Sequence, residues 1–151
     1  MSKKVAVVMG SDSDLDTMRP CISRLKSFGI PAEVRIISAH RTPAAAEALA
    51  SHAAENGFGV IIAAAGKAAH LGGVVAAFTP LPVIGVPMKT SDLGGMDSLL
   101  SMVQMPSGVP VACVAINGAK NAAIYATQIL GACDPEYRKV IEKMKQEMAD
   151  A

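Results

Sequence analysis

The stretch Val5-Ala6-Val7-Val8-Met9-Gly10-Ser11-Asp12-Ser13-Asp14 decides the fold class. Five consecutive apolar residues without polar alternation are typical of a strand that a parallel sheet buries on both faces. After the polar turn, apolar residues recur at three- and four-residue spacing, which predicts an amphipathic helix: Leu15, Met18, Ile22, Leu25 and Phe28. A buried strand, a polar turn and a helix together form the repeating unit of an α/β sheet.

The same unit recurs along the rest of the chain. Further strands are predicted at residues 32–37, 60–65, 82–86 and 109–116. Further helices are predicted from 43 to about 57, in a short segment ending near 78, and at 98–104, 119–130 and about 134–149. Strands this apolar predict a doubly wound parallel sheet with helices on both faces and no half-exposed strand. Without a linker or internal repeat, residues 1–151 are expected to form one domain.

Composition and charge exclude several classes of function. The net charge is +1 without a basic cluster, which argues against binding to nucleic acid. Aromatic residues are only 3% of the chain, too few to stack bases or a flavin ring. The long uncharged stretch at residues 71–88 is interrupted by glycines and prolines and does not resemble a membrane helix. We therefore expect a soluble, cytoplasmic protein whose surplus apolar surface is covered by self-association.

The three cysteines, Cys21, Cys113 and Cys133, are odd in number and have no C-x-x-C spacing. This pattern predicts reduced thiols in the core rather than a disulfide or a redox motif.

The first polar turn, residues 10–14, offers backbone N–H groups and hydroxyls at the start of a helix, which favours an anion. Asp12 is expected to cap the helix. For Asp14 two interpretations stay open, namely capping and a hydrogen bond to a sugar hydroxyl. The turn lacks the G-x-x-x-x-G-K-[ST] pattern, so nothing indicates ATP chemistry by a phosphate loop.

The second turn, Ser38-Ala39-His40-Arg41-Thr42-Pro43, places two hydroxyls, an imidazole and a guanidinium at the end of a strand. Arg41 is either a clamp for phosphate or carboxylate or a solvated arginine. His40 is either a general acid and base, because histidine titrates near neutral pH, or a capping or core residue. Thr42 is expected to cap the next helix, with Pro43 in its first position.

The third turn, residues 66–73, consists mainly of small residues that let a ligand approach the backbone. For His70 a packing role is slightly favoured over contact with a ligand, and for Lys67 exposure is favoured over contact with an anion. His52 is expected at the surface without a role. Because His40 and His70 have no acidic or cysteine companions nearby in the sequence, no metal site is expected.

Four separated motifs together resemble one known family. They are residues 10–14, residues 38–43, residues 68–71 (Ala-Ala-His-Leu) and residues 97–106 (Asp-Ser-Leu-Leu-Ser-Met-Val-Gln-Met-Pro). The family is that of the phosphoribosylaminoimidazole carboxylase catalytic subunit, which makes 4-carboxy-5-aminoimidazole ribonucleotide in de novo purine biosynthesis. One branch is a mutase acting on N5-carboxyaminoimidazole ribonucleotide, and the other carboxylates aminoimidazole ribonucleotide directly with CO2. Arg41 and the Ala-Ala-His-Leu loop resemble the mutase branch, since direct carboxylases tend to have lysine at position 41.

The resemblance implies a flavodoxin-like three-layer fold, a homo-octamer, and no metal or organic cofactor. It also implies functional pairing with an ATP-dependent synthase that supplies the substrate. His40 would carry the proton, Asp14 would bind the ribose, and Arg41 with the serines would bind the phosphate. The substrate-binding residues implied are Ser11, Ser13, Asp14, Ser38, Arg41, Gly66, Lys67, Ala69, His70 and Leu71.

Two departures from the family and one non-enzyme alternative bear on this interpretation. Lys67 stands where many mutases have glycine, and Gly72 where they usually have proline. A flavodoxin-like receiver module would suit Asp12 and Asp14. It would also need an acceptor aspartate at the end of the third strand, where this chain has Ala63-Ala64-Ala65-Gly66, and we therefore do not favour it.

Overall fold

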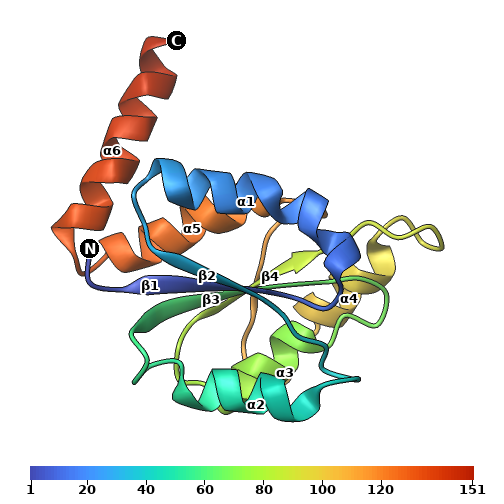
Figure 1. Ribbon diagram of the computed structural model, residues 1–151. Coiled ribbons are helices and arrows are strands. Elements are labelled where there is room, and N and C mark those ends of the chain that lie inside the picture. The colour runs from blue at the N-terminus through green and yellow to red at the C-terminus, as the bar shows by residue number, and fades with distance from the viewer.

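The computed structural model describes all residues from 1 to 151 as a five-stranded parallel sheet between two layers of helices (Figure 1). The strands are β1 (Lys4–Met9), β2 (Ala32–Ile36), β3 (Phe58–Ala65), β4 (Val83–Pro87) and β5 (Ala112–Cys113). They lie in the order β2-β1-β3-β4-β5, and all neighbours pair in parallel. The direction of winding changes between β1 and β3, which makes this edge the topological switch point.

The helices divide between the two faces of the sheet. On one face α1 (Leu15–Ser27) packs beside α5 (Ala119–Gly131), and on the other α2 (Pro43–His52) packs beside α3 (Leu71–Phe78) (Figure 1). The remaining helices are α4 (Met96–Val103), which packs on β4 and β5, and α6 (Pro135–Asp150), which packs on α5 and projects from the body. A short 3-10 turn, η1 (Asp12–Asp14), precedes α1. No helix of the structure has both the length and the apolar content that a membrane span requires.

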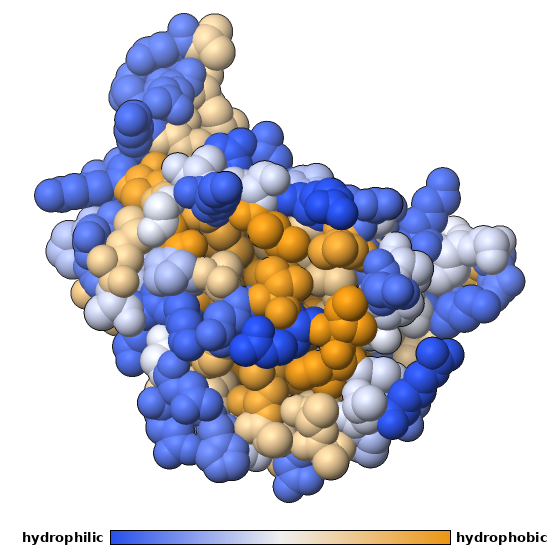
Figure 2. All heavy atoms as spheres, viewed as in Figure 1, coloured by the Kyte–Doolittle hydropathy of each residue, from blue (hydrophilic) through white to orange (hydrophobic).

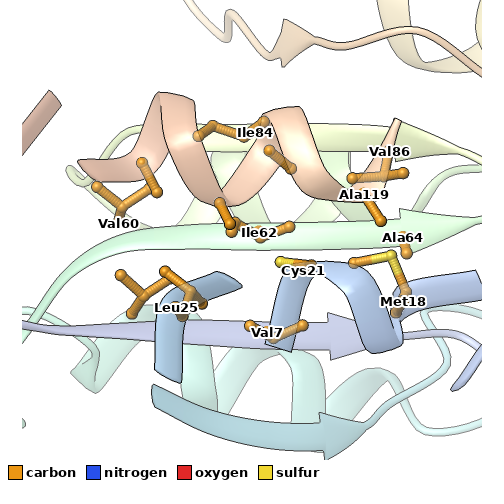
Figure 3. Close-up of a cluster of buried hydrophobic side chains, with 14 of the residues drawn as sticks. Val7, Met18, Cys21, Leu25, Val60, Ile62, Ala64, Ile84, Val86 and Ala119 are labelled. Carbon is orange, nitrogen blue, oxygen red and sulfur yellow. The ribbon is translucent and has the colours of Figure 1, made fainter. Parts of the chain in front are cut away.

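The side chains of β1 alternate between two separate cores. Val5, Val7 and Met9 face α1 and α5, while Ala6 and Val8 face α2 and α3. Figure 3 shows the first core, where Val7 and Ile62 of the sheet meet Met18, Cys21 and Leu25 of α1. Both sets are buried, as the uninterrupted apolar run predicted, and the doubly wound fold class is confirmed.

The prediction that no strand is half exposed is wrong for β2. This strand lies at the edge of the sheet and pairs only with β1. Ile36 is 53% exposed, and Glu33 and Arg35 form an ion pair (3.4 Å) at the surface. Figure 2 shows apolar side chains gathered on the face of the molecule that carries β2.

Other boundaries also differ from the prediction. β5 pairs only over Ala112–Cys113 rather than 109–116, because only these residues are in register with β4. α2 ends at His52, and α4 begins at Met96, just after Gly95 in a left-handed conformation (φ 102°). α1 extends from Leu15 to Ser27 with Pro20 inside it.

The cysteines divide into three environments. Cys21 is buried, and burial raises the pKa of its thiol to about 12. Cys113 is half-buried, which also raises the pKa of its thiol. Cys133 is exposed, so the prediction of three core thiols is wrong for this residue, which lies just beyond the end of α5 at the surface.

The last helix is tied to the first strand through one buried side chain. Asp134 caps α6, with its carboxylate accepting from the N–H of Glu136 (2.9 Å). One turn later the ring of Tyr137 is fully buried in the core. Its hydroxyl donates to the carbonyl of Lys3 (2.6 Å) and accepts from the Lys3 N–H (2.8 Å). This pair of bonds fixes α6 against the residue that precedes β1.

We predict that Tyr137→Phe lowers the free energy of unfolding by about 1 kcal/mol, the typical net contribution of a hydrogen bond whose partners water can still reach. Denaturant titration measures the change. The matched control is Tyr125→Phe, because Tyr125 is 42% exposed and its hydroxyl makes no hydrogen bond within the chain. Equal losses in the two variants would contradict a specific role for the bonds to Lys3.

Candidate active site at the carboxyl edge of the sheet

Four turns at the carboxyl ends of β1, β2, β3 and β4 border a pocket of about 510 Å³. The pocket lies at the switch point of the sheet, where ligands bind in open α/β folds. It is bordered by all but one of the residues singled out from the sequence: Ser11, Ser13, Asp14, Ser38, His40, Arg41, Gly66, Lys67, His70 and Leu71. The exception is Ala69, which is 1% exposed and packs in the core beneath α2 and α3.

The first turn is organised by Ser11. Its hydroxyl accepts from the Ser13 N–H (3.3 Å) and shares a hydrogen bond with the Ser13 hydroxyl (2.9 Å). The prediction that Asp12 caps the helix is therefore wrong. The chain tightens into a 3-10 turn, so Ser11 takes the capping position with extended backbone (φ −151°, ψ 150°), and Asp12 is left exposed.

Asp14 precedes α1 but makes no capping hydrogen bond, so the capping interpretation of this residue is not supported. Its half-buried carboxylate borders the pocket. Burial raises the pKa of this carboxyl above its ordinary value of 3.8, and a hydrogen bond from the Ser11 backbone opposes the shift more weakly. The carboxylate thus keeps free acceptor positions on the pocket wall.

The second turn is closed by its own hydroxyl groups. The Thr42 hydroxyl accepts from the Ser38 N–H (2.9 Å) and donates to the Ser38 carbonyl (3.0 Å), while the Ser38 hydroxyl accepts from the Arg41 N–H (3.0 Å). Pro43 begins α2 as predicted, but the expected cap by Thr42 is wrong, because its hydroxyl binds back to Ser38 instead of to α2.

This closed turn leaves the functional groups of His40 and Arg41 at the pocket. The guanidinium of Arg41 forms no hydrogen bond or ion pair within the chain, and it can bind an anion. A smaller hollow of about 330 Å³ lies between the first two turns, and Ser11, Ser38 and Arg41 border both spaces.

The third turn brings His70 to His40. The Nδ1 atom of His70 lies 2.8 Å from the Nε2 atom of His40, and both rings are exposed. The favoured packing role for His70 is therefore wrong, since the residue stands at the start of α3 on the pocket rim. Lys67 lies beside it with a left-handed backbone (φ 54°), and its ammonium is 3.3 Å from the carboxylate of Asp92.

The fourth turn, residues 88–91, was missed in the sequence although it borders the pocket. Its place in the alternation of strands and helices was the available signal, because the turn after any parallel strand opens on the same edge. It adds Lys89, Thr90 and Ser91 to the pocket wall.

Residues of α4 hold this fourth turn and the third in place. The Thr90 hydroxyl donates to the Asp97 carboxylate (2.9 Å), and the buried Ser98 hydroxyl donates to the Met88 carbonyl (2.6 Å). The Ser101 hydroxyl donates to the Asp97 carbonyl (2.7 Å) and reaches the carbonyl of Lys67 (3.4 Å). The motif at residues 97–106 therefore supports the pocket wall rather than lining the pocket.

A sheet of order β2-β1-β3-β4-β5 with polar turns at its switch point defines a flavodoxin-like α/β protein with a pocket suited to a small anionic ligand. Within that class, residues 4–151 match the AIR carboxylase family, and the chain belongs to this family.

Relatives and a solved structure agree with this assignment. The chain is 56% identical over 147 residues to the N5-carboxyaminoimidazole ribonucleotide mutase of Mycobacterium tuberculosis, a match covering 97% of this chain and 84% of that protein. It is 57% identical over 145 residues to the phosphoribosylaminoimidazole carboxylase of Saccharomyces cerevisiae, covering 95% of this chain and 25% of that protein. The crystal structure of Treponema denticola PurE superposes with a TM-score of 0.89 at 30% identity, covering 98% and 92% of the two chains. The family resemblance read from the four motifs is confirmed.

The ionised carboxylate of Asp14 is expected to lower the free energy of unfolding, which can be tested. Because burial raises the pKa of its carboxyl, the folded protein binds a proton there more tightly than the unfolded chain does. The contribution of protonated Asp14 to the stability of the fold is fully present below about pH 3.8, and it is lost as the pH rises through the pKa of Asp14 in the folded protein. The ionised carboxylate is therefore destabilising at neutral pH.

We predict that Asp14→Asn raises the free energy of unfolding at pH 7, and that this gain shrinks as the pH falls toward 3.8. Asparagine serves as well as aspartate in the position before a helix, so the helix start is preserved. Denaturant titrations at several pH values measure the effect, with Asp12→Asn as the exposed control in the same turn. A loss of stability at pH 7 in Asp14→Asn would sink the idea.

Proposed function

We propose that the protein is a mutase of de novo purine biosynthesis that converts N5-carboxyaminoimidazole ribonucleotide to 4-carboxy-5-aminoimidazole ribonucleotide. The observation that carries this proposal is the 56% identity, over nearly the whole chain, with a relative named as that mutase. Arg41, at the position where direct carboxylases tend to have lysine, supports the same branch of the family. The alternative, direct carboxylation of aminoimidazole ribonucleotide with CO2, is not favoured.

The substrate phosphate is proposed to bind Arg41 together with the hydroxyls of Ser11, Ser13 and Ser38. Two features support this placement. The guanidinium of Arg41 has no partner in the chain, and Ser11 and Ser38 border the same hollow as Arg41. Asp14, which borders the larger pocket but not the smaller hollow, is proposed to bind the ribose hydroxyls.

His40 is proposed as the acid and base of the carboxylate transfer. Protonated His40 gives a proton to N5 as the bond between N5 and the carboxylate carbon breaks and CO2 forms. C4 then attacks the CO2, and the proton that C4 loses returns to His40. The proton given in the first half is thus replaced in the second, and the enzyme is restored. One imidazole can serve both steps because histidine changes its charge near neutral pH.

The transfer requires that CO2 stay next to C4 between the two steps. Small and apolar residues of the second and third turns form that part of the wall: Ala39, Gly66, Ala68 and Leu71. A wall of this kind brings the two reactants close and offers few groups that hold water. The third turn is accordingly the proposed site of the imidazole and the migrating carboxylate.

We propose a homo-octamer in the cytoplasm that receives its substrate from an ATP-dependent synthase. Exposed apolar residues support the assembly. Before and along α4 they are Leu93 (66% exposed), Met96, Leu100 and Val103, and the last three lie on one face of the helix. Monomeric proteins rarely leave such a face uncovered.

The mutase and the direct carboxylase are distinguished by the fate of external CO2. We predict that purified protein, given N5-carboxyaminoimidazole ribonucleotide in ¹³C-labelled bicarbonate, forms a product that gains label only slowly by exchange. Mass spectrometry of the product at short times measures this. Stoichiometric labelling from the first turnovers would assign direct carboxylation instead.

We predict that His40→Asn lowers turnover by roughly 10²–10⁴-fold, the usual contribution of a positioned general acid and base. Asparagine fills a similar volume, so the fold should persist, and sedimentation velocity should give the same octameric mass as for the wild type. His52→Gln is the matched control, since His52 is exposed on α2 outside the pocket. Near-normal turnover in His40→Asn would remove His40 from this role.

A further inference from the structure

The contact between His40 and His70 joins two turns that are not neighbours in the sheet. His40 follows β2 and His70 follows β3, and β1 lies between these strands. The Nε2 and Nδ1 atoms are 2.8 Å apart, a hydrogen-bond distance. The rings are nearly perpendicular (88°) with centroids 5.0 Å apart, so they meet at their nitrogen atoms rather than by stacking. The other two ring nitrogens have no hydrogen-bond partner in the chain.

We propose that His70 is a positioning residue, which keeps the proton of neutral His40 on Nε2 and so makes Nδ1 the nitrogen that exchanges a proton with the substrate. This inference rests on the proposed function, because it assigns the two nitrogens of His40 their parts in the transfer. It goes beyond a contact of His70 with the substrate, since His70 acts here through His40.

The direction of the hydrogen bond follows from the charge cycle of His40. A neutral imidazole carries one N–H, so within the pair one nitrogen donates and the other accepts. When His40 is protonated, both of its nitrogens carry hydrogen, and Nδ1 of His70 must accept. If His70 donated from Nδ1 instead, two N–H groups would meet at 2.8 Å whenever His40 is charged. Only the arrangement in which Nδ1 of His70 accepts is possible both when His40 is neutral and when it is protonated.

In that arrangement the bond from Nε2 of His40 to Nδ1 of His70 is the same before and after each transfer. Nδ1 of His40 releases a proton to N5 in the first half of the reaction and takes one from C4 in the second. The number of protons on the pair changes only at Nδ1, and His70 keeps its own proton on Nε2 throughout. Which ring nitrogen of a histidine reacts is generally set by the bond that the other one makes.

The backbone of His70 is fixed at the start of α3. Its N–H donates to the Ala68 carbonyl (2.9 Å), and its carbonyl accepts from the N–H of Val74 (2.9 Å) at the start of α3. The next residue, Leu71, is 2% exposed and anchors the helix in the core. No other side chain of the protein bonds to the His40 ring, so His70 is its one orienting partner within the chain.

The first test needs no substrate. In ¹⁵N NMR of histidine-labelled protein, only three histidines give signals. The variant His52→Gln serves as the control, because the signals that it lacks are those of His52. We expect neutral His40 to carry its proton on Nε2 alone in the wild type and in His70→Asn, whose side-chain oxygen can also accept. In His70→Ala we expect a mixture of both tautomers. A His40 proton on Nδ1 in the wild type, or an unchanged tautomer in His70→Ala, overturns the proposal.

The second test separates positioning from substrate binding. We expect His70→Ala to lower kcat roughly 10- to 100-fold with little change in KM, the range typical for loss of a partner that orients a histidine, and His70→Asn to recover most of kcat. A raised KM with unchanged kcat would overturn the proposal and make His70 a substrate contact. If the protein lacks mutase activity altogether, the NMR experiment still decides whether His70 sets the tautomer of His40. Failure of the proposed function can therefore be told apart from failure of the positioning role.

Discussion

The burial of β1 on both faces is the constraint on which the rest of the structure depends. None of the residues from Val5 to Met9 is more than 1% exposed, so β1 cannot lie at an edge and needs a partner strand on each side and a helix layer on each face. Because β2 and β3 both pair with it in parallel, the carboxyl ends of the three strands lie together. The turns that follow are polar, and their side chains meet in one pocket.

The same reasoning explains how much of the fold could be predicted. An apolar run indicates that a segment is buried. This was enough to predict β1, β3 and β4 as strands and the sheet as doubly wound. It does not report which strand pairs with which. Val34 and Ile36 have the composition of a buried strand, yet β2 is at the edge. Residues 109–116 form an apolar run of which only Ala112–Cys113 pairs, in a segment where Pro110 has no N–H to donate.

For the site, topology and residue type predicted the location but not the local contacts. The sequence predicted a turn after each of the first three strands, and these turns share one edge of the sheet. Which hydroxyl caps which N–H depends on differences of one residue in the turn, and so Ser11 rather than Asp12 caps η1, and Thr42 binds Ser38. The bond between His40 and His70 spans 30 positions and has no local pattern at all. Only the family resemblance placed both residues in one site.

The hydrogen bonds inside the turns determine what is left for a ligand. Hydroxyl groups satisfy the backbone of the first and second turns, and α4 holds the third and fourth through Asp97, Ser98 and Ser101. These bonds hold the backbone of the turns without using the charged side chains. Arg41 therefore stays unpaired, and the half-buried carboxylate of Asp14 keeps free acceptor positions. The half-buried carboxylate of Asp14 destabilises the empty protein, and both groups can bind a ligand without the reorganisation that a flexible loop would require. The opposite face of α4 is the exposed apolar surface, so one helix connects the pocket wall to the proposed assembly.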